Sequence, residues 1–288
     1  MKKTKIIVPA LGILLLSTAA SVTGTVAWFT AANDVDVSGM QFTAQSEQAI
    51  VVSNEGRASW LNSGVKASHN GEGATFLTTS TSDFAHWYHA YSTDADNGQV
   101  TVDRVELTVV KPTYGETSAS TGLGTVVQED EEAADAAFNG QNVYLLNRFY
   151  VQSATQVALS GQDLYIKDLK ITNTAASLKN ADLDASLRVG VVYGTSNFIF
   201  APVAGASASY QVNATTNVTA ITNTAAGVVI SGASGVTVPA FSNNGTDALP
   251  IDVYIWFEGE DVNNKSANVL DTMDNLNVTF KIGNRAHS

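Results

Sequence analysis

Two groups of acidic side chains are the strongest candidates for ligand chemistry in this sequence. In the first, Asp94 and Asp96 alternate along the chain before Asn97-Gly98. The second comprises four acids near the C-terminus, namely Glu258, Glu260, Asp261 and Asp271. Ca²⁺ prefers carboxylate oxygens, so either group could bind calcium outside the cell. The first lacks the bidentate glutamate of a calcium loop and is explained equally well as a turn, and both groups could be solvated loops.

Two of the four histidines stand three residues apart in His86-Trp87-Tyr88-His89. Imidazole suits zinc or copper, but residues i and i+3 of a strand point to opposite faces. We therefore expect an aromatic-rich strand here and not a metal site.

The sequence carries none of the common signatures of catalysis. It has no cysteine, which excludes disulfides, thiolate metal sites and cysteine nucleophiles. It also lacks a nucleophile elbow, a phosphate-binding loop, a His-Glu-x-x-His motif and a dinucleotide-binding glycine motif. A glycosidase needs only two carboxylates, so the 27 acidic residues leave that class open. The sequence favours a protein that is not an enzyme and has no cofactor other than the calcium considered above.

Composition limits the partners of the chain. With 44% hydrophobic and 15% charged residues, the 288-residue chain has enough apolar material to fold. The 15 Lys and Arg residues against 27 acids give a formal charge of −12, so no positive field exists to bind nucleic acid or an anionic membrane surface.

The N-terminus has the order of a secretory signal. Three lysines within the first five residues precede the apolar run 6–16 and the small residues 17–21. Cleavage after Ala27 is our preferred prediction, and cleavage after Ala19 or Ala20 also satisfies the small-x-small rule. The mature chain would begin at Trp28 with a formal charge of −15, because residues 1–27 hold three lysines and no acid.

An uncleaved anchor is the alternative. Residues 6–29 are nearly continuous in apolar character and could just span a bilayer of about 30 Å. Pro9, Gly12, Gly24 and several Ser and Thr residues weaken this segment as a spanning helix. We therefore expect membrane contact only through the signal segment, before it is cleaved.

The rest of the chain is predicted to be mostly strands. Period-two alternation of apolar residues occurs in five segments, 100–109, 164–171, 187–193, 251–257 and 276–282. Two further candidates, 40–52 and 143–151, are rich in aromatic and β-branched residues. The alternation breaks at Asp103-Arg104 and again at 167–168, as it does at a β-bulge. Short helices are expected only at 128–139 and 266–275, the second capped by Ser266.

This pattern predicts an antiparallel β-sandwich of jelly-roll or Greek-key type with one or two short helices, because the strand–helix alternation of a parallel sheet is missing. The residues expected on inward faces are Val105, Leu107, Val109, Leu187, Val189, Val191, Ile251, Val253, Ile255, Val278 and Phe280. The opposite phase would bury Asp252, Glu106 and Arg188, and an unpaired buried charge is costly.

Residues 201–239 contain no charged side chain. They could form a long exposed hairpin or a low-complexity insertion. Alternatively, uncharged strands with a free edge would form a surface between subunits. The predicted organisation is therefore a signal peptide at 1–27, an N-terminal strand at 28–45, and a sandwich domain at 46–288 with an uncharged insertion around 201–239.

The segment 28–38 is predicted to be a strand without an obvious partner nearby in the sequence. Trp28 and Phe29 open it, and Val35 and Val37 alternate with polar residues. It could add to the sheet of a neighbouring subunit, so that head-to-tail repetition builds an open filament. It could equally be an edge strand of its own domain.

The run Gly24-Thr25-Val26-Ala27-Trp28-Phe29-Thr30 resembles the signal-peptide end of the TasA/camelysin family. The C-terminal stretch 255–261, with an amphipathic stretch and a last strand after it, is similar to the ending of many exported proteins with the same type of signal. The resemblance implies a secreted protein of a Gram-positive bacterium, processed by a dedicated signal peptidase and assembled into extracellular matrix fibres.

Together these features predict a secreted structural subunit that polymerises with itself, with other surface or matrix components as further partners. The alternatives are a cell-surface adhesin or carbohydrate-binding module, and a pilin-like, surface-layer or virion subunit that keeps its N-terminal helix.

Overall fold

The structure is a computed structural model of the chain. It describes residues 34–37, 40–47, 49–54, 57, 59–61, 65–68, 74–94, 100–112, 122–127, 138–175, 186–201, 210–212, 217–222, 226–259 and 272–288. The predicted signal peptide, Trp28, Phe29 and the first ten residues of the helix predicted at 128–139 lie outside these residues, and Phe138 and Asn139 are not in an α-helix. Within them the elements are strands, and no α-helix is present.

The first of two packed sheets is built on the long antiparallel pair β11 (Leu159–Ala175) and β19 (Thr272–Ala286). Beyond β11 lie β15 (Asn217–Thr222), β16 (Val228–Val229) and β17 (Val236–Val238), with β14 (Tyr210–Val212) outside β15. Along the other side of β19 run β1 (Asp34–Val37) and β2 (Gln41–Ser46), both parallel to it, and β4 (Val65–Ser68) pairs with β2.

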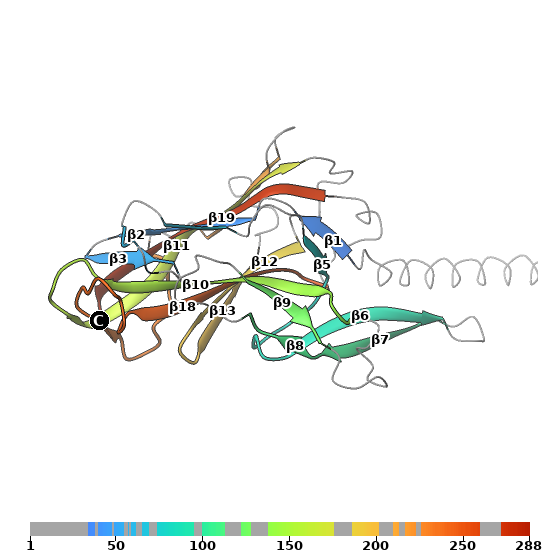
Figure 1. Cartoon of the computed structure of the whole chain (residues 1–288), viewed down its shortest axis with the longest axis horizontal. Helices are drawn as coiled ribbons and strands as arrows, with labels where there is room; N and C mark the ends of the chain where they lie inside the picture. Colours follow the sequence, from blue (N-terminus) through green and yellow to red (C-terminus); the bar gives the residue numbers. More distant parts are fainter. Residues whose placement is uncertain are drawn as a thin grey trace, which may run out of the picture.

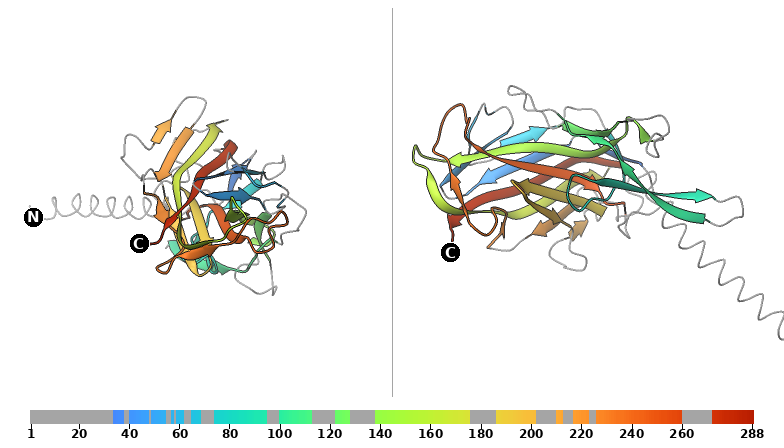
Figure 2. Two further views of the ribbon diagram at one scale, coloured as in Figure 1. Left: turned by 90° about the vertical axis from the view of Figure 1, so that its left-hand side faces the viewer. Right: turned by 90° about the horizontal axis from the view of Figure 1, so that it is seen from below.

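The second sheet is built on β10 (Asn142–Ser153) and β18 (Leu249–Phe257). β12 (Leu187–Tyr193) and β13 (Ser196–Phe200) follow on the side of β18. β3 (Ile50–Ser53), β9 (Gly122–Val126) and β8 (Val109–Val110) lie on the side of β10. The long strands of both sheets run along the long axis of the molecule (Figure 1, Figure 2).

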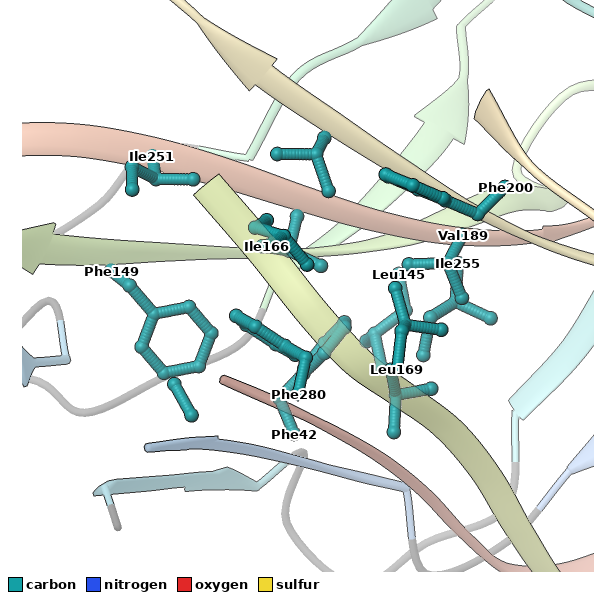
Figure 3. Close-up of a cluster of buried hydrophobic side chains, with 14 of the residues drawn as sticks. Phe42, Leu145, Phe149, Ile166, Leu169, Val189, Phe200, Ile251, Ile255 and Phe280 are labelled. Atoms are coloured by element: carbon teal, nitrogen blue, oxygen red, sulfur yellow. The ribbon is translucent and has the colours of Figure 1, made fainter. Parts of the chain in front are cut away.

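The main core fills the space between the two sheets. Phe42 of β2 and Phe280 of β19 pack edge-on against Phe149 of β10, with ring centroids 6.4 and 5.5 Å apart. Figure 3 shows these side chains together with aliphatic residues of β11, β12 and β18 pointing toward one another. The chain passes between the sheets at β2–β3, β3–β4, β10–β11, β11–β12, β13–β14, β17–β18 and β18–β19, among other places. The predicted all-β sandwich is therefore confirmed.

The second sheet is buried on its outer face as well. There the hairpin of β6 (Trp87–Asp94) and β7 (Val100–Leu107) covers Tyr144, Tyr254 and Trp256. Val105 and Leu107 are buried as predicted, but in this second cluster and not in the main core, and Val109 is half-buried. The sequence did not predict a third layer, because the alternation in 251–257 identifies the face that packs in the main core and does not show what covers the other face.

Asp252 of β18 is not part of the main core, as the alternation pattern predicts, but it is buried. Arg148 donates two hydrogen bonds to its carboxylate, at 2.6 and 2.9 Å, and Lys111 Nζ lies 2.8 Å from it. The cost of burying the charge is offset because both partners reach it.

Three local predictions have clear outcomes. A register shift between Lys167 and Lys170 of β11, with Asp168 at φ 52°, confirms the bulge expected there. The bulge expected at Asp103-Arg104 is wrong, since β6 and β7 pair without interruption. The helix expected at 266–275 is wrong over its last four residues, which begin β19, because pairing with β11 outweighs local helix preference there.

Asn147 of β10 is a polar residue at a core-facing position, between Leu145 and Phe149, and is fully buried. Among the described residues neither its Oδ1 nor its Nδ2 has a hydrogen-bond partner. We expect Asn147→Val to raise the free energy of unfolding by about 1–3 kcal/mol, because it removes the desolvation cost of an unpaired amide. Urea unfolding measures this, with Asn147→Asp as the destabilising comparison. A loss of stability in Asn147→Val would mean that the amide has a partner.

Candidate functional site

The candidate site is the position of the N-terminal strand β1 between two other strands, which we call the β1 slot. On one side β1 pairs antiparallel with β5 (Ala74–Leu77) along its whole length, from Asp34 opposite Leu77 to Val37 opposite Ala74. On the other side it pairs parallel with the start of β19, where Asp36 and Val37 lie opposite Thr272 and Met273. Figure 1 shows β1 and β5 next to each other at one end of the sandwich.

The β1 slot connects the two sheets. β5 continues to β10 through a parallel pairing of Phe76 with Asn142, whose Nδ2 donates a 3.1 Å hydrogen bond to the Thr75 carbonyl. The order β19–β1–β5–β10 therefore joins the first sheet to the second. Without β1, both β5 and the first residues of β19 would lose a partner strand.

The side chains of the slot belong to the main core. Val37 is only 1% exposed, and Met40, which follows β1, is also fully buried. On the neighbouring strand β5, Phe76 is buried with its ring 6.1 Å from that of Phe257. The alternation that picked out Val37 in the sequence thus reflects a core position. Val35 lies opposite Phe76 in the register.

The sequence leaves two predictions for the segment 28–38. It is either a strand donated to another subunit or an edge strand of its own domain. The structure seats residues 34–37 inside the sheet of their own chain, with a strand on each side and not at an edge. The sequence could not identify these partners, because β5 is about 40 residues away in the chain and β19 more than 230.

Of the first acidic group, the structure describes Asp94. Asp94 is the last residue of β6 and lies opposite Val100, the first of β7. Asp96 lies outside the described residues.

The second acidic group is represented by Glu258 alone, since Glu260, Asp261 and Asp271 lie outside the described residues. Its carboxylate accepts hydrogen bonds from the Ser80 hydroxyl and from Trp256 Nε1, the latter at 3.4 Å. Its backbone N–H donates to the Ser186 carbonyl. Within the described part of the chain, no three His, Asp or Glu side chains gather as metal ligands would.

The two histidines of the 86–89 segment lie in opposite environments, as the strand geometry predicts. His89 is buried and packs against Phe138, with ring centroids 4.7 Å apart, whereas His86 is exposed. His86 Nδ1 lies 2.6 Å from Asp83 Oδ2, and the backbone amides of Ala85 and His86 donate to Asp83 Oδ1. These bonds shape the loop that leads into β6.

These hydrogen bonds shift the pKa values of both Asp83 and His86. The backbone amide of His86, followed by its ring, lowers the pKa of Asp83 to about 2. The hydrogen bond to Asp83 raises the pKa of His86 above its ordinary value of 6.5. The Asp83 contribution to stability is thus present above pH 3.8 and is lost as the pH falls toward 2. The His86 contribution is present below pH 6.5 and is lost as the pH rises through the raised pKa.

We expect an NMR titration to give His86 a midpoint above 6.5, and Asp83→Asn to return it toward 6.5. Ser82→Ala, a change in the same loop that leaves Asp83 in place, should leave the midpoint unchanged. An identical midpoint with and without the Asp83 carboxylate would contradict the pairing.

Among the residues described, no helix is long and apolar enough to cross a membrane. Comparison with known proteins gave no matching protein family, no matching curated protein and no matching solved structure.

Proposed function

We propose that this protein is an exported structural subunit that polymerises head to tail into extracellular filaments. In the filament, β1 of one copy occupies the β1 slot between β5 and β19 of the next copy. The protein is not an enzyme in this proposal, and its main partner is another copy of itself.

The observation that carries the proposal is the contrast between the position of β1 in the sequence and its position in the fold. It is the first described strand of the chain, yet it has a partner on each side and contributes Val37 to the core. An identical β1 from another copy would make the same main-chain hydrogen bonds and fill the same core position, so exchange requires no new interface. Each copy both donates and accepts, which leaves the chain of contacts open.

The sequence next to β1 is compatible with exchange. Residues 38–40 separate β1 from β2, and they include Gly39, a residue type that accepts backbone conformations that others do not. A change of direction at this point would carry β1 away from its own slot while β2 stays beside β19.

Export supports the same proposal. The signal-like residues 1–27 and the resemblance of 24–30 to the TasA/camelysin family both favour secretion and assembly at the cell surface. The strongly acidic composition argues against nucleic acid as a partner. Assembly through β1 needs no cofactor. If calcium bound at the acidic groups contributed to assembly, EDTA would alter the filaments.

The adhesin or carbohydrate-binding alternative has less support. Sugar-binding modules present aromatic faces to solvent, whereas Trp87 and Trp256 are buried in the second cluster. Trp60 is half-buried and packs against Phe241, with ring centroids 6.5 Å apart.

The proposal is tested by N-terminal sequencing of the exported protein, followed by negative-stain microscopy of the purified chain at increasing concentration. We expect a first residue at or near Trp28 and unbranched filaments. A chain that keeps Met1 favours the pilin-like alternative. A chain that stays monomeric at high concentration contradicts filament assembly.

A further inference from the structure

Apart from the separate β6–β7 hairpin, the described strands form one curled and branched sheet, with β4 and β8 ending two of its side branches. Reading the pairings from strand to strand gives the order β13–β12–β18–β10–β5–β1–β19–β11–β15–β14. The β1 slot closes one side of the sandwich. On the opposite side the sheet ends at β13 and β14, and within the described residues each pairs with a single strand.

β13 has the backbone geometry of an open edge. It forms a hairpin with β12 through the two-residue turn Gly194-Thr195, and Tyr193 lies opposite Ser196. In such a hairpin the residues next to the turn exchange hydrogen bonds, and alternate residues point their N–H and C=O groups away. Asn197 and Ile199 are therefore the residues whose main-chain groups face outward.

The side chains of β13 anchor it on one face and leave the other open. Phe200 is buried and Phe198 packs against the main core, so the strand is fixed. Asn197 is exposed, and Ile199 is 41% exposed, one of four large hydrophobic side chains at the surface of the described residues. Figure 1 shows the β12–β13 hairpin at the margin of the molecule.

The edge strand β13 contains no charged residue. Proteins commonly block exposed edges with lysine or proline. In contrast, no residue from Val189 to Thr246 is charged, and this range includes both end strands of the curled sheet.

Charge also indicates the kind of partner. Two copies of the predicted mature chain, with a formal charge of −15, repel each other wherever their acidic surfaces meet. A contact between copies is favoured where both surfaces are uncharged, and an uncharged strand can pair antiparallel with itself about a two-fold axis. A basic partner would instead favour the acidic surfaces elsewhere on the molecule.

We propose that β13 of one copy pairs antiparallel with β13 of a second copy, so that the second sheets of two subunits form one continuous sheet. If the subunits form filaments through β1, as proposed above, this two-fold contact joins neighbouring filaments side by side. In this respect the inference rests on the proposed function. In the absence of filaments the same contact produces a dimer.

The test uses the full mature chain and the variant Ile199→Lys, which places two like charges across the contact. Val157→Lys is the matched control, because Val157 is 66% exposed and lies in the turn between β10 and β11. Ile199→Pro is a second variant, since it removes an outward N–H that β12 does not use. Circular dichroism and urea unfolding establish that each variant is folded.

Wild type and Val157→Lys are expected to form paired or bundled filaments in negative-stain images. Ile199→Lys and Ile199→Pro are expected to form single filaments and to need at least about tenfold more protein before filaments associate. Bundling that persists unchanged in both folded variants would overturn the inference while leaving filament assembly intact. If no filaments form but light scattering detects a dimer that Ile199→Lys dissociates, the β13 contact stands and the proposed function fails.

Discussion

Deletion of residues 28–38 from the mature chain is expected to abolish filaments and leave a folded but less stable monomer. The deletion removes β1, so β5 and the first residues of β19 each lose a partner strand, and the core loses Val37. Burial of one valine contributes roughly 1.5–3 kcal/mol, and the lost hydrogen bonds add to that. Negative-stain microscopy and urea unfolding measure the two effects.

A synthetic peptide of residues 28–38 provides the control for this deletion. Added in excess, it should bind the truncated chain and raise its unfolding midpoint, because it fills the empty slot. A peptide with Asp at the position of Val37 should bind less tightly, since it places a charge in the core. Filaments formed by the truncated chain would show that assembly does not depend on β1.

Replacement of Trp87 is expected to cause the largest loss of stability among single changes in the second cluster. Trp87 is 1% exposed, and its ring centroid lies 4.7 Å from that of Tyr144 and 5.6 Å from that of Trp256. Trp87→Ala leaves a large cavity between the β6–β7 hairpin and the second sheet. We expect it to lower the free energy of unfolding by about 3–5 kcal/mol in urea titrations.

Tyr88→Ala is the matched control, because Tyr88 is the next residue of the same strand and faces the opposite way, half-exposed. Its cost should be less than half that of Trp87→Ala. Equal losses for the two variants would mean that the hairpin does not depend on packing against the second sheet.

Much of the fold was predictable because each long strand carries its own alternation. The 187–193 and 251–257 segments match β12 and β18 closely, since each has apolar residues on the face that packs in the main core. The bulge in β11 was predictable for the same reason, because an extra residue shifts the phase of the pattern.

Features that depend on distant contacts were not predictable from one sequence. The burial of Asp252 depends on Arg148 and Lys111, both more than 100 residues away. The start of β19 reads locally as a helix and becomes a strand because β11 and β1 pair with it. Local patterns carry no information about such partners.

The candidate site was likewise predictable in its local pattern but not in its distant contacts. Alternation identified Val35 and Val37 as a strand, but their position between β5 and β19 required the structure. The acidic groups were visible in the sequence as charges. The hydrogen bonds of the Glu258 carboxylate to Ser80 and Trp256 depend on the fold of a loop that no motif describes.

The most direct test of strand exchange is a disulfide that can form only between copies. The chain has no cysteine, and Asp36 lies opposite Thr75 across the β1–β5 pair, within the Cα separation that a disulfide requires. Asp36→Cys and Thr75→Cys are prepared as separate full-length mature chains, mixed, assembled and oxidised, with Val157→Cys replacing Thr75→Cys as the control. We expect a heterodimer band on a non-reducing gel for the mixed pair and none for the control. The absence of that band in assembled filaments would contradict it, because β1 would then have stayed in its own chain.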